Sequence, residues 1–127
     1  ATGEMSTEAG PVYGEAVDTE RFLPAAGQGA VGIEIRKGDE VSAAFVRAIN
    51  HAPTMTAITA EREFLRLLDG GCHTPVGVVT QAFGDSLMME GIVFPEGDAI
   101  GDPMTAEVSG SLSEPLKVAE TLFKSLS

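Results

Sequence analysis

The sequence has few aromatic residues and a single cysteine. Among its 127 residues there is no tryptophan, one tyrosine and six phenylalanines, so a core has to be built mainly from Val, Leu, Ile, Ala and Met. The single cysteine, Cys72, excludes an internal disulfide framework and the common multi-cysteine zinc sites, and no metal site is expected. One unpaired thiol is typical of a reducing compartment, so we expect a cytoplasmic protein.

Positive charge is also scarce. Eight Lys and Arg residues stand against 19 Asp and Glu residues, and residues 1–20 and 71–112 contain no Lys or Arg. This pattern excludes the basic stripe that nucleic-acid binding requires and disfavours an anionic membrane surface as a partner. No apolar run approaches the roughly 18 residues that cross a bilayer, and the start does not resemble a signal peptide. Because the sequence lacks an initiator methionine, we expect it to be part of a longer protein.

The overall composition is that of a folded protein, with 43% hydrophobic and 21% charged residues, and the length predicts one domain or slightly more. Residues 1–21 have little periodicity and are expected to form a loop with a short strand near 12–13. Alternating apolar residues over 31–36 predict a strand. Asp39 is then the expected N-cap of a helix that includes residues 41–49.

Two further helices are expected within residues 51–127. The first has apolar residues at helical spacing, is capped by Thr54 or Thr56, and ends at Asp69, before two glycines. The second follows an N-cap at Ser113 and carries a proline in its first turn, where proline is tolerated.

Between these two helices the apolar period changes to two, which predicts three antiparallel strands over 76–80, 87–94 and 100–111. The dipeptide 84–85 (Gly-Asp) is expected to be the hairpin turn between the first two strands. The predicted fold class is therefore α+β, a three-stranded antiparallel sheet with helices on one face. The preceding strand and helix over 30–50 have apolar faces with no obvious partner in this chain, so we assign them to another domain of the full protein.

The segment 27–32 matches the pattern GxGxxG. This pattern alone would suggest dinucleotide binding, but the fingerprint needs a strand before it and a helix after it. Here a strand is expected to follow. The favoured interpretation is a tight bend at which the backbone approaches another group closely.

Cys72 has two interpretations. A cysteine is most often a small buried hydrophobic residue. However, Gly70 and Gly71 give the preceding loop freedom and Pro75 stiffens its exit, an arrangement that presents a side chain to a cleft. The preceding helix C-terminus would not stabilise a thiolate, so an activated nucleophile is not expected. A thiol that meets a very reactive electrophile needs no such activation.

Three motifs together resemble the porphobilinogen deaminase (hydroxymethylbilane synthase) family: FLPAAGQGAVGIEIR (22–36), TAEREFLRLLDGGC (59–72) and CHTPVG (72–77). The resemblance implies a three-domain transferase of haem and chlorophyll (tetrapyrrole, porphyrin) biosynthesis. Its substrate is porphobilinogen, and four molecules are condensed into hydroxymethylbilane. Its cofactor, dipyrromethane, is attached through a covalent thioether to the cysteine that corresponds to Cys72.

The resemblance also implies roles for the remaining parts of the chain. Gly70 and Gly71 belong to the cofactor loop, and Gln28 and Gly29 line the cofactor cleft. Residues 1–50 are the C-terminal remnant of the first two domains, with the crossover loop at 25–29, and residues 51–127 are the cofactor-attachment domain. The family's catalytic aspartate and most of its substrate-binding arginines lie in the first two domains, so no catalytic residue is expected in this chain. We expect the isolated chain to be inactive without its N-terminal domains.

An alternative function is a standalone, non-catalytic binding or assembly module in which Cys72 is only structural. Such a module would bury the apolar faces of residues 30–50 by self-association. The mass of the Cys72 peptide and the size of the chain in solution distinguish the two functions.

Overall fold

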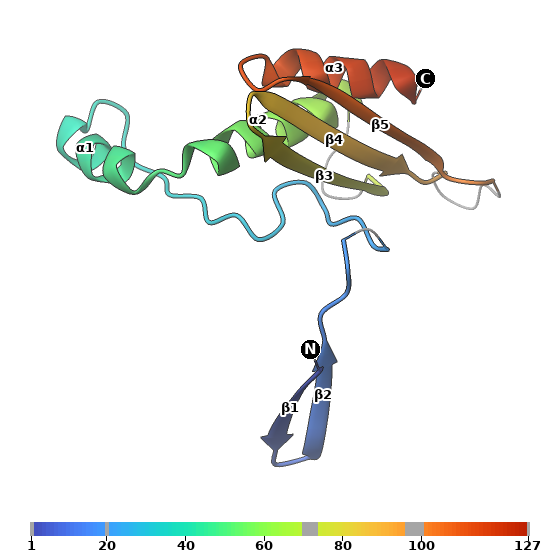
Figure 1. The fold of residues 1–127 in the computed structure, drawn as a ribbon. Coiled ribbons are helices and arrows are strands. Elements are labelled where there is room, and N and C mark those ends of the chain that lie inside the picture. Colours follow the sequence, from blue (N-terminus) through green and yellow to red (C-terminus); the bar gives the residue numbers. More distant parts are fainter. Residues whose placement is uncertain (1, 20, 70–73, 96–100, 127) are drawn as a thin grey trace.

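The computed structural model describes residues 2–19, 21–69, 74–95 and 101–126 (Figure 1). Along the chain, the elements are β1 (Thr2–Thr7), β2 (Gly10–Glu15), α1 (Glu40–Ile49), α2 (Ala52–Leu67), β3 (Val76–Phe83), β4 (Ser86–Val93), β5 (Met104–Ser111) and α3 (Pro115–Ser125). Cys72, Gly70 and Gly71 lie outside the described residues.

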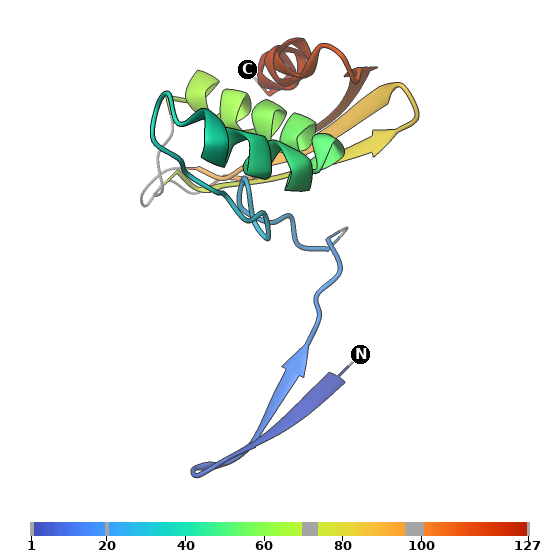
Figure 2. The ribbon, with the colours of Figure 1, turned by 90° about the vertical axis from the view of Figure 1, so that its left-hand side faces the viewer.

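The strands β3, β4 and β5 form one antiparallel sheet in that order, and α2 and α3 lie over the same face of it (Figure 2). The predicted α+β class is confirmed. The turn at 84–85 is also confirmed, because Phe83 pairs with Ser86 across it and Gly84 adopts a φ of 56°. Glycine takes this left-handed conformation without strain.

The core lies between the sheet and the two covering helices. Strand β4 directs Leu87 and Met89 toward the helices, as the alternation of a half-buried strand requires. Helix α2 contributes Phe64 and α3 contributes Leu122, and both are fully buried. Gly91 lies beneath them, where a Cβ atom would come within 3.1 Å of a Leu122 methyl carbon. The core residues are Ala60, Phe64, Val78, Leu87, Met89, Val118, Ala119, Leu122 and Leu126.

The start of α2 differs from the prediction. The helix begins at Ala52 with His51 as its N-cap, not at Thr54 or Thr56. The His51 Nδ1 atom lies 2.8 Å from the Thr54 Oγ1 atom and accepts the Thr54 amide at 3.4 Å. The reason is Pro53, which fits the first helical turn and so moves the start of the helix ahead of both threonines.

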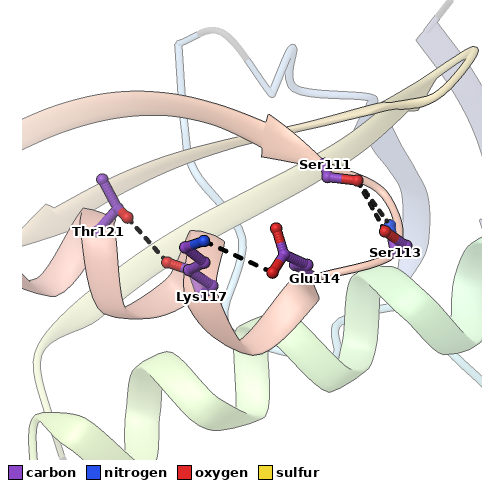
Figure 3. Close-up of polar contacts among 5 residues, drawn as sticks. All are labelled: Ser111, Ser113, Glu114, Lys117 and Thr121. Atoms are coloured by element: carbon purple, nitrogen blue, oxygen red, sulfur yellow. Dashed lines mark hydrogen bonds and ion pairs between the residues drawn. The ribbon is translucent and has the colours of Figure 1, made fainter.

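The start of α3 was also predicted at the wrong capping residue. Glu114 occupies the N-cap position, and its side chain makes no capping hydrogen bond. Ser113 instead lies with its hydroxyl oxygen 2.8 Å from that of Ser111 (Figure 3). The Lys117 ammonium group lies 3.5 Å from the Glu114 carboxylate. Pro115 is in the first turn as predicted.

Residues 2–15 form a hairpin of β1 and β2, where a loop with only a short strand was predicted. The hairpin extends away from the rest of the chain (Figures 1 and 2). Its turn is closed by the Thr7 hydroxyl, which donates to the Gly10 carbonyl at 2.7 Å, and Gly10 has a φ of 116°. The ladder consists of backbone hydrogen bonds, which apolar periodicity does not report.

The predicted strand over 31–36 was wrong. This segment has no strand assignment, and Val31 is 90% exposed. A strand exists only when its backbone pairs with a neighbour, and the described part of the chain places no strand beside this segment. The following helix α1 is confirmed, with the Asp39 carboxylate accepting the Ser42 amide at 3.0 Å. It buries none of its residues, and Phe45 is 72% exposed.

Candidate functional site

A loop over residues 22–30 crosses the edge strand of the sheet. The Val78 amide of β3 donates to the Pro24 carbonyl at 2.8 Å, so the loop continues the backbone pairing of the sheet for one residue. Next to this bond, a Cβ atom on Gly77 would lie 2.8 Å from the Leu23 Cβ atom and 2.9 Å from the Leu23 carbonyl oxygen. Only glycine allows this contact, which places the loop against the start of β3.

The second half of the loop is folded into two consecutive turns. The Gln28 amide donates to the Ala25 carbonyl at 3.0 Å, and the Ala30 amide donates to the Gly27 carbonyl at 3.1 Å. Gly27 and Gly29 have φ values of 73° and 81°, which L side chains rarely adopt. Ala26 packs against the core, whereas Gln28 and Gly29 are exposed. The predicted tight bend is therefore present, and it presents Gln28 and Gly29 at the surface.

A buried carboxylate supports this loop from below. Glu61 of α2 is only 7% exposed, and its Oε2 atom accepts the Gly27 amide at 2.7 Å. Burial raises the pKa of Glu61 above its usual value, and the hydrogen bond from the Gly27 amide partly opposes this rise. The Thr80 hydroxyl is buried and close enough to act on the carboxylate, but it makes no hydrogen bond of good geometry within the described residues.

Glu61 was not among the residues that the sequence indicated. A signal was available, because Glu61 lies three residues before the buried Phe64 and three after Ile58, on the apolar face of α2. A carboxylate in such a position needs donors from elsewhere in the fold. Glu63, by contrast, has its own partner within the helix, the exposed Arg66, at 2.6 Å.

The residues on both sides of the Cys72 segment are described. Before it, α2 ends at Leu67, and Asp69 is exposed and takes a φ of 52°, the left-handed conformation that ends many helices. After it, Thr74 is half-buried, and the Pro75 carbonyl accepts the Phe94 amide at 2.9 Å. The segment therefore starts at a helix end and runs into the edge strand that the loop 22–30 contacts.

The pattern GxGxxG at 27–32 does not have the surroundings of a dinucleotide site. In the described part of the chain, no strand ends directly before it and no helix begins directly after it. Its first two glycines serve the turns of the loop instead.

A cavity of about 840 Å³ lies on the other side of the loop, between residues 27–34, α1 and the start of α2. Its lining is partly apolar, from Val31, Ile33 and Ile58, and the exposed Arg62 also borders it. The described residues contain no group of three or more His, Cys, Asp or Glu that could hold a metal ion. No helix within the described ranges is long and apolar enough to span a membrane.

Comparison with known proteins gives one consistent family. Residues 55–126 match the family described as porphobilinogen deaminase, C-terminal domain. The porphobilinogen deaminase of Moorella thermoacetica is 39% identical over 127 residues, which is 99% of this chain and 40% of that protein. The enzyme of Nitrobacter hamburgensis is 46% identical over 82 residues, and that of Thermus thermophilus is 38% identical over 102 residues. These alignments cover 64% and 79% of this chain but only 26% and 33% of those two proteins, so the chain spans less than half of each relative.

Proposed function

Since this chain belongs to the porphobilinogen deaminase family, we propose that it is the cofactor-carrying C-terminal part of a hydroxymethylbilane synthase. The complete protein would condense four porphobilinogen molecules, with loss of ammonia, in the tetrapyrrole pathway to haem and chlorophyll. In this proposal Cys72 anchors the dipyrromethane primer, and Gln28 and Gly29 line the cleft in which the chain grows.

One observation carries the proposal. The loop with Gln28 and the strand that begins four residues after Cys72 are joined directly, by the hydrogen bond from the Val78 amide to the Pro24 carbonyl. The motif at 22–36 and the motif at 72–77 are far apart in sequence, and this hydrogen bond makes the first a neighbour of the strand that contains the end of the second. The segment that contains Cys72 leads directly into this strand, which supports a role of both motifs in one site.

The residues present suit such a primer. Cys72 supplies the thiol, and the described residues on either side of its segment are accessible to solvent at Asp69 and partly accessible at Thr74. Loss of ammonia from porphobilinogen leaves an electron-poor methylene carbon. An ordinary thiol captures this carbon as the C–S bond forms and the thiol proton is released, so no lowered thiol pKa is needed. A thioether at Cys72 would hold the primer on this domain, and a tethered chain would make each addition effectively intramolecular.

Residues 1–50 are proposed to belong with the first two domains of the complete protein. The exposure of Val31 and Phe45 supports this assignment, because an amphipathic helix normally buries its apolar face. The family's catalytic aspartate lies in those domains, so the chain alone is proposed to be inactive. Its single cysteine is compatible with a reducing, cytoplasmic location.

The test is an assay of hydroxymethylbilane formation. The protein expressed from the complete gene should be active, and its C72S variant should have no activity, because serine cannot form the thioether. The purified 127-residue chain should show no turnover. Turnover by the isolated chain, or full activity of the C72S protein, would contradict the proposal.

A second candidate is a module that self-associates through residues 30–50. The exposed apolar side chains of α1 and of the segment before it favour it. Sedimentation of the 127-residue chain measures this directly. A dimer that dissociates when Phe45 is replaced by Ser would support self-association, whereas a monomer would leave those side chains for the missing domains.

A further inference from the structure

We propose that Glu61 is a positioning residue whose carboxylate holds the Gly27 amide and thereby fixes Gln28 at the cofactor cleft. The contact itself is a property of this chain. Its consequence for the reaction rests on the proposed function, because it requires that the loop 25–29 lines the cleft. We call the hydrogen bond between the Glu61 Oε2 atom and the Gly27 amide the Glu61 contact.

The Glu61 contact is a strong one because the carboxylate is buried. A carboxylate that is only 7% exposed cannot rely on water for its hydrogen bonds, so it needs donors from the protein. The Gly27 amide lies at 2.7 Å, which is short for a bond from a backbone amide and typical of an ionised acceptor. Removing either partner leaves a buried polar group without its bond, which costs more than the bond adds.

The second step is the geometry of the loop. A φ of 73° at Gly27 turns its amide inward toward α2, and the turns that follow bring Gln28 and Gly29 outward. Gln28 follows Gly27 directly in the chain. Its position therefore depends on where the Gly27 amide is held, since one residue cannot absorb a large displacement within a closed turn.

The third step separates the two halves of the loop. Its first half is tied to β3 by the bond to the Pro24 carbonyl and by the close contact between Leu23 and Gly77. These contacts lie on the sheet. The Glu61 contact reaches the second half from the helix layer, 34 residues away in sequence. The loop is thus held by both layers of the domain, and the helix layer holds the half that carries Gln28.

The last step is the chemistry of the carboxylate. The hydrogen bond from the Gly27 amide stabilises the ionised form, while burial opposes it. The causes of the shift include no charged group. A glutamine at this position would keep an oxygen that accepts the Gly27 amide and would remove the buried charge. An alanine would remove the acceptor, and an aspartate would shorten the side chain by one methylene and withdraw the acceptor.

The test measures exchange of the Gly27 amide hydrogen by NMR in the 127-residue chain. The E61A and E61D variants should speed this exchange by about tenfold relative to the unchanged chain, whereas E61Q should leave it nearly unchanged. The matched control is E63Q, which neutralises a carboxylate of the same helix that is bonded to Arg66 and not to the loop, and it should leave the Gly27 exchange unchanged. If E61A does not fold, E61D provides the comparison. If the Gly27 amide exchanges as slowly in folded E61A or folded E61D as in the unchanged chain, the proposal is overturned.

The same variants in the protein from the complete gene test the consequence for the reaction. The E61A protein should lose about tenfold in kcat with a smaller change in KM, and E61Q should restore most of it. An E61A protein with unchanged kcat, or an E61Q protein as slow as E61A, would overturn the positioning role.

Absence of a pyrrole adduct at Cys72 would refute the proposed function while the amide exchange still reports on the Glu61 contact. An adduct together with unaltered exchange would refute the Glu61 contact alone.

Discussion

Both halves of this chain contain paired strands and an amphipathic helix, but they differ in burial. Residues 51–127 place two helices on a three-stranded sheet and bury nine hydrophobic side chains between them. Helix α1, in residues 1–50, is just as clearly amphipathic in sequence but buries none of its residues, and the hairpin β1–β2 stands apart (Figure 1). Local sequence therefore determines that α1 is a helix, but burial of its apolar face requires a partner that residues 51–127 do not supply.

Between these halves lies the loop 22–30, which precedes α1 in sequence but packs on the second half. Its contacts at Gly77, Val78 and Glu61 join it to both layers of that half. Structurally it belongs to the C-terminal unit, although the family model begins only at residue 55. The comparison between the halves can be tested by substitutions that act on one half and not on the other.

The largest expected effect compares two phenylalanines. Phe64 is fully buried in the core, whereas Phe45 of α1 is 72% exposed. The F64A substitution should lower the free energy of unfolding by about 3–5 kcal/mol, because it creates a cavity. The F45A substitution should change it by less than about 0.5 kcal/mol. Urea denaturation followed by circular dichroism measures both, and comparable losses would contradict the burial difference between the halves.

The next effect compares two glycines. At Gly77 an added Cβ atom would lie 2.8 Å from the Leu23 Cβ atom, whereas at Gly32 an added Cβ atom meets no atom within 4 Å. The G77A substitution should therefore cost about 1–3 kcal/mol, as overpacking does, and should displace the loop 22–30. The G32A substitution is the matched control and should be nearly neutral. Equal thermal unfolding of the two variants would show that the loop is not held against β3.

A smaller effect is expected from the titration of Glu61. Burial raises the folded-state pKa of Glu61 above the usual 4.5, so the folded state binds its proton more tightly than the unfolded state does. By linkage, this group's contribution to stability is fully present below about pH 4.5 and is lost as the pH rises through the folded-state pKa. The E61Q variant has no carboxyl group to titrate at this position, so its stability should not fall for this reason as the pH rises. Denaturation of both proteins across that pH range checks it, and parallel curves would contradict the raised pKa.

The smallest effect is expected at the cap of α1. The Asp39 carboxylate accepts the Ser42 amide at 3.0 Å, and hydrogen bonding to Ser42 lowers the pKa of Asp39. The D39A substitution should speed amide exchange within α1 by less than about tenfold. Because α1 is not part of the core, unfolding of residues 51–127 should not change. A shift in that transition would indicate that α1 packs on the second half after all.

The sequence predicted the elements whose patterns are local. Periodicity found helix α2 and the strands β3 and β4, because their apolar periods of 3.6 and two mark the face that each packs on the core. The turn at Gly84 was found from its Gly-Asp dipeptide. The predicted strand over 31–36 failed because a strand requires a neighbouring edge, and the described residues place none beside this segment. The hairpin over 2–15 was missed because its ladder consists of backbone hydrogen bonds, which apolar periodicity does not report.

The candidate site was predictable in part. The bend at Gly27 followed from the glycine pattern, whereas the place of Gln28 at the cofactor cleft stays a prediction from the family resemblance. Glu61 was missed because its donor lies 34 residues away, and no local spacing links a helix carboxylate to a loop amide. The predicted capping residues Thr54, Thr56 and Ser113 were wrong because a proline one to three positions away decides where each helix begins.

The central claim is that Cys72 carries a covalently bound pyrrole primer, and the most direct measurement is the mass of the Cys72 peptide. The peptide should be taken from the protein expressed from its complete gene, because the partial chain is not expected to build the primer. We predict a mass increase equal to two porphobilinogen units less two molecules of ammonia. A Cys72 peptide of unmodified mass, from a protein that nevertheless forms hydroxymethylbilane, would contradict the account.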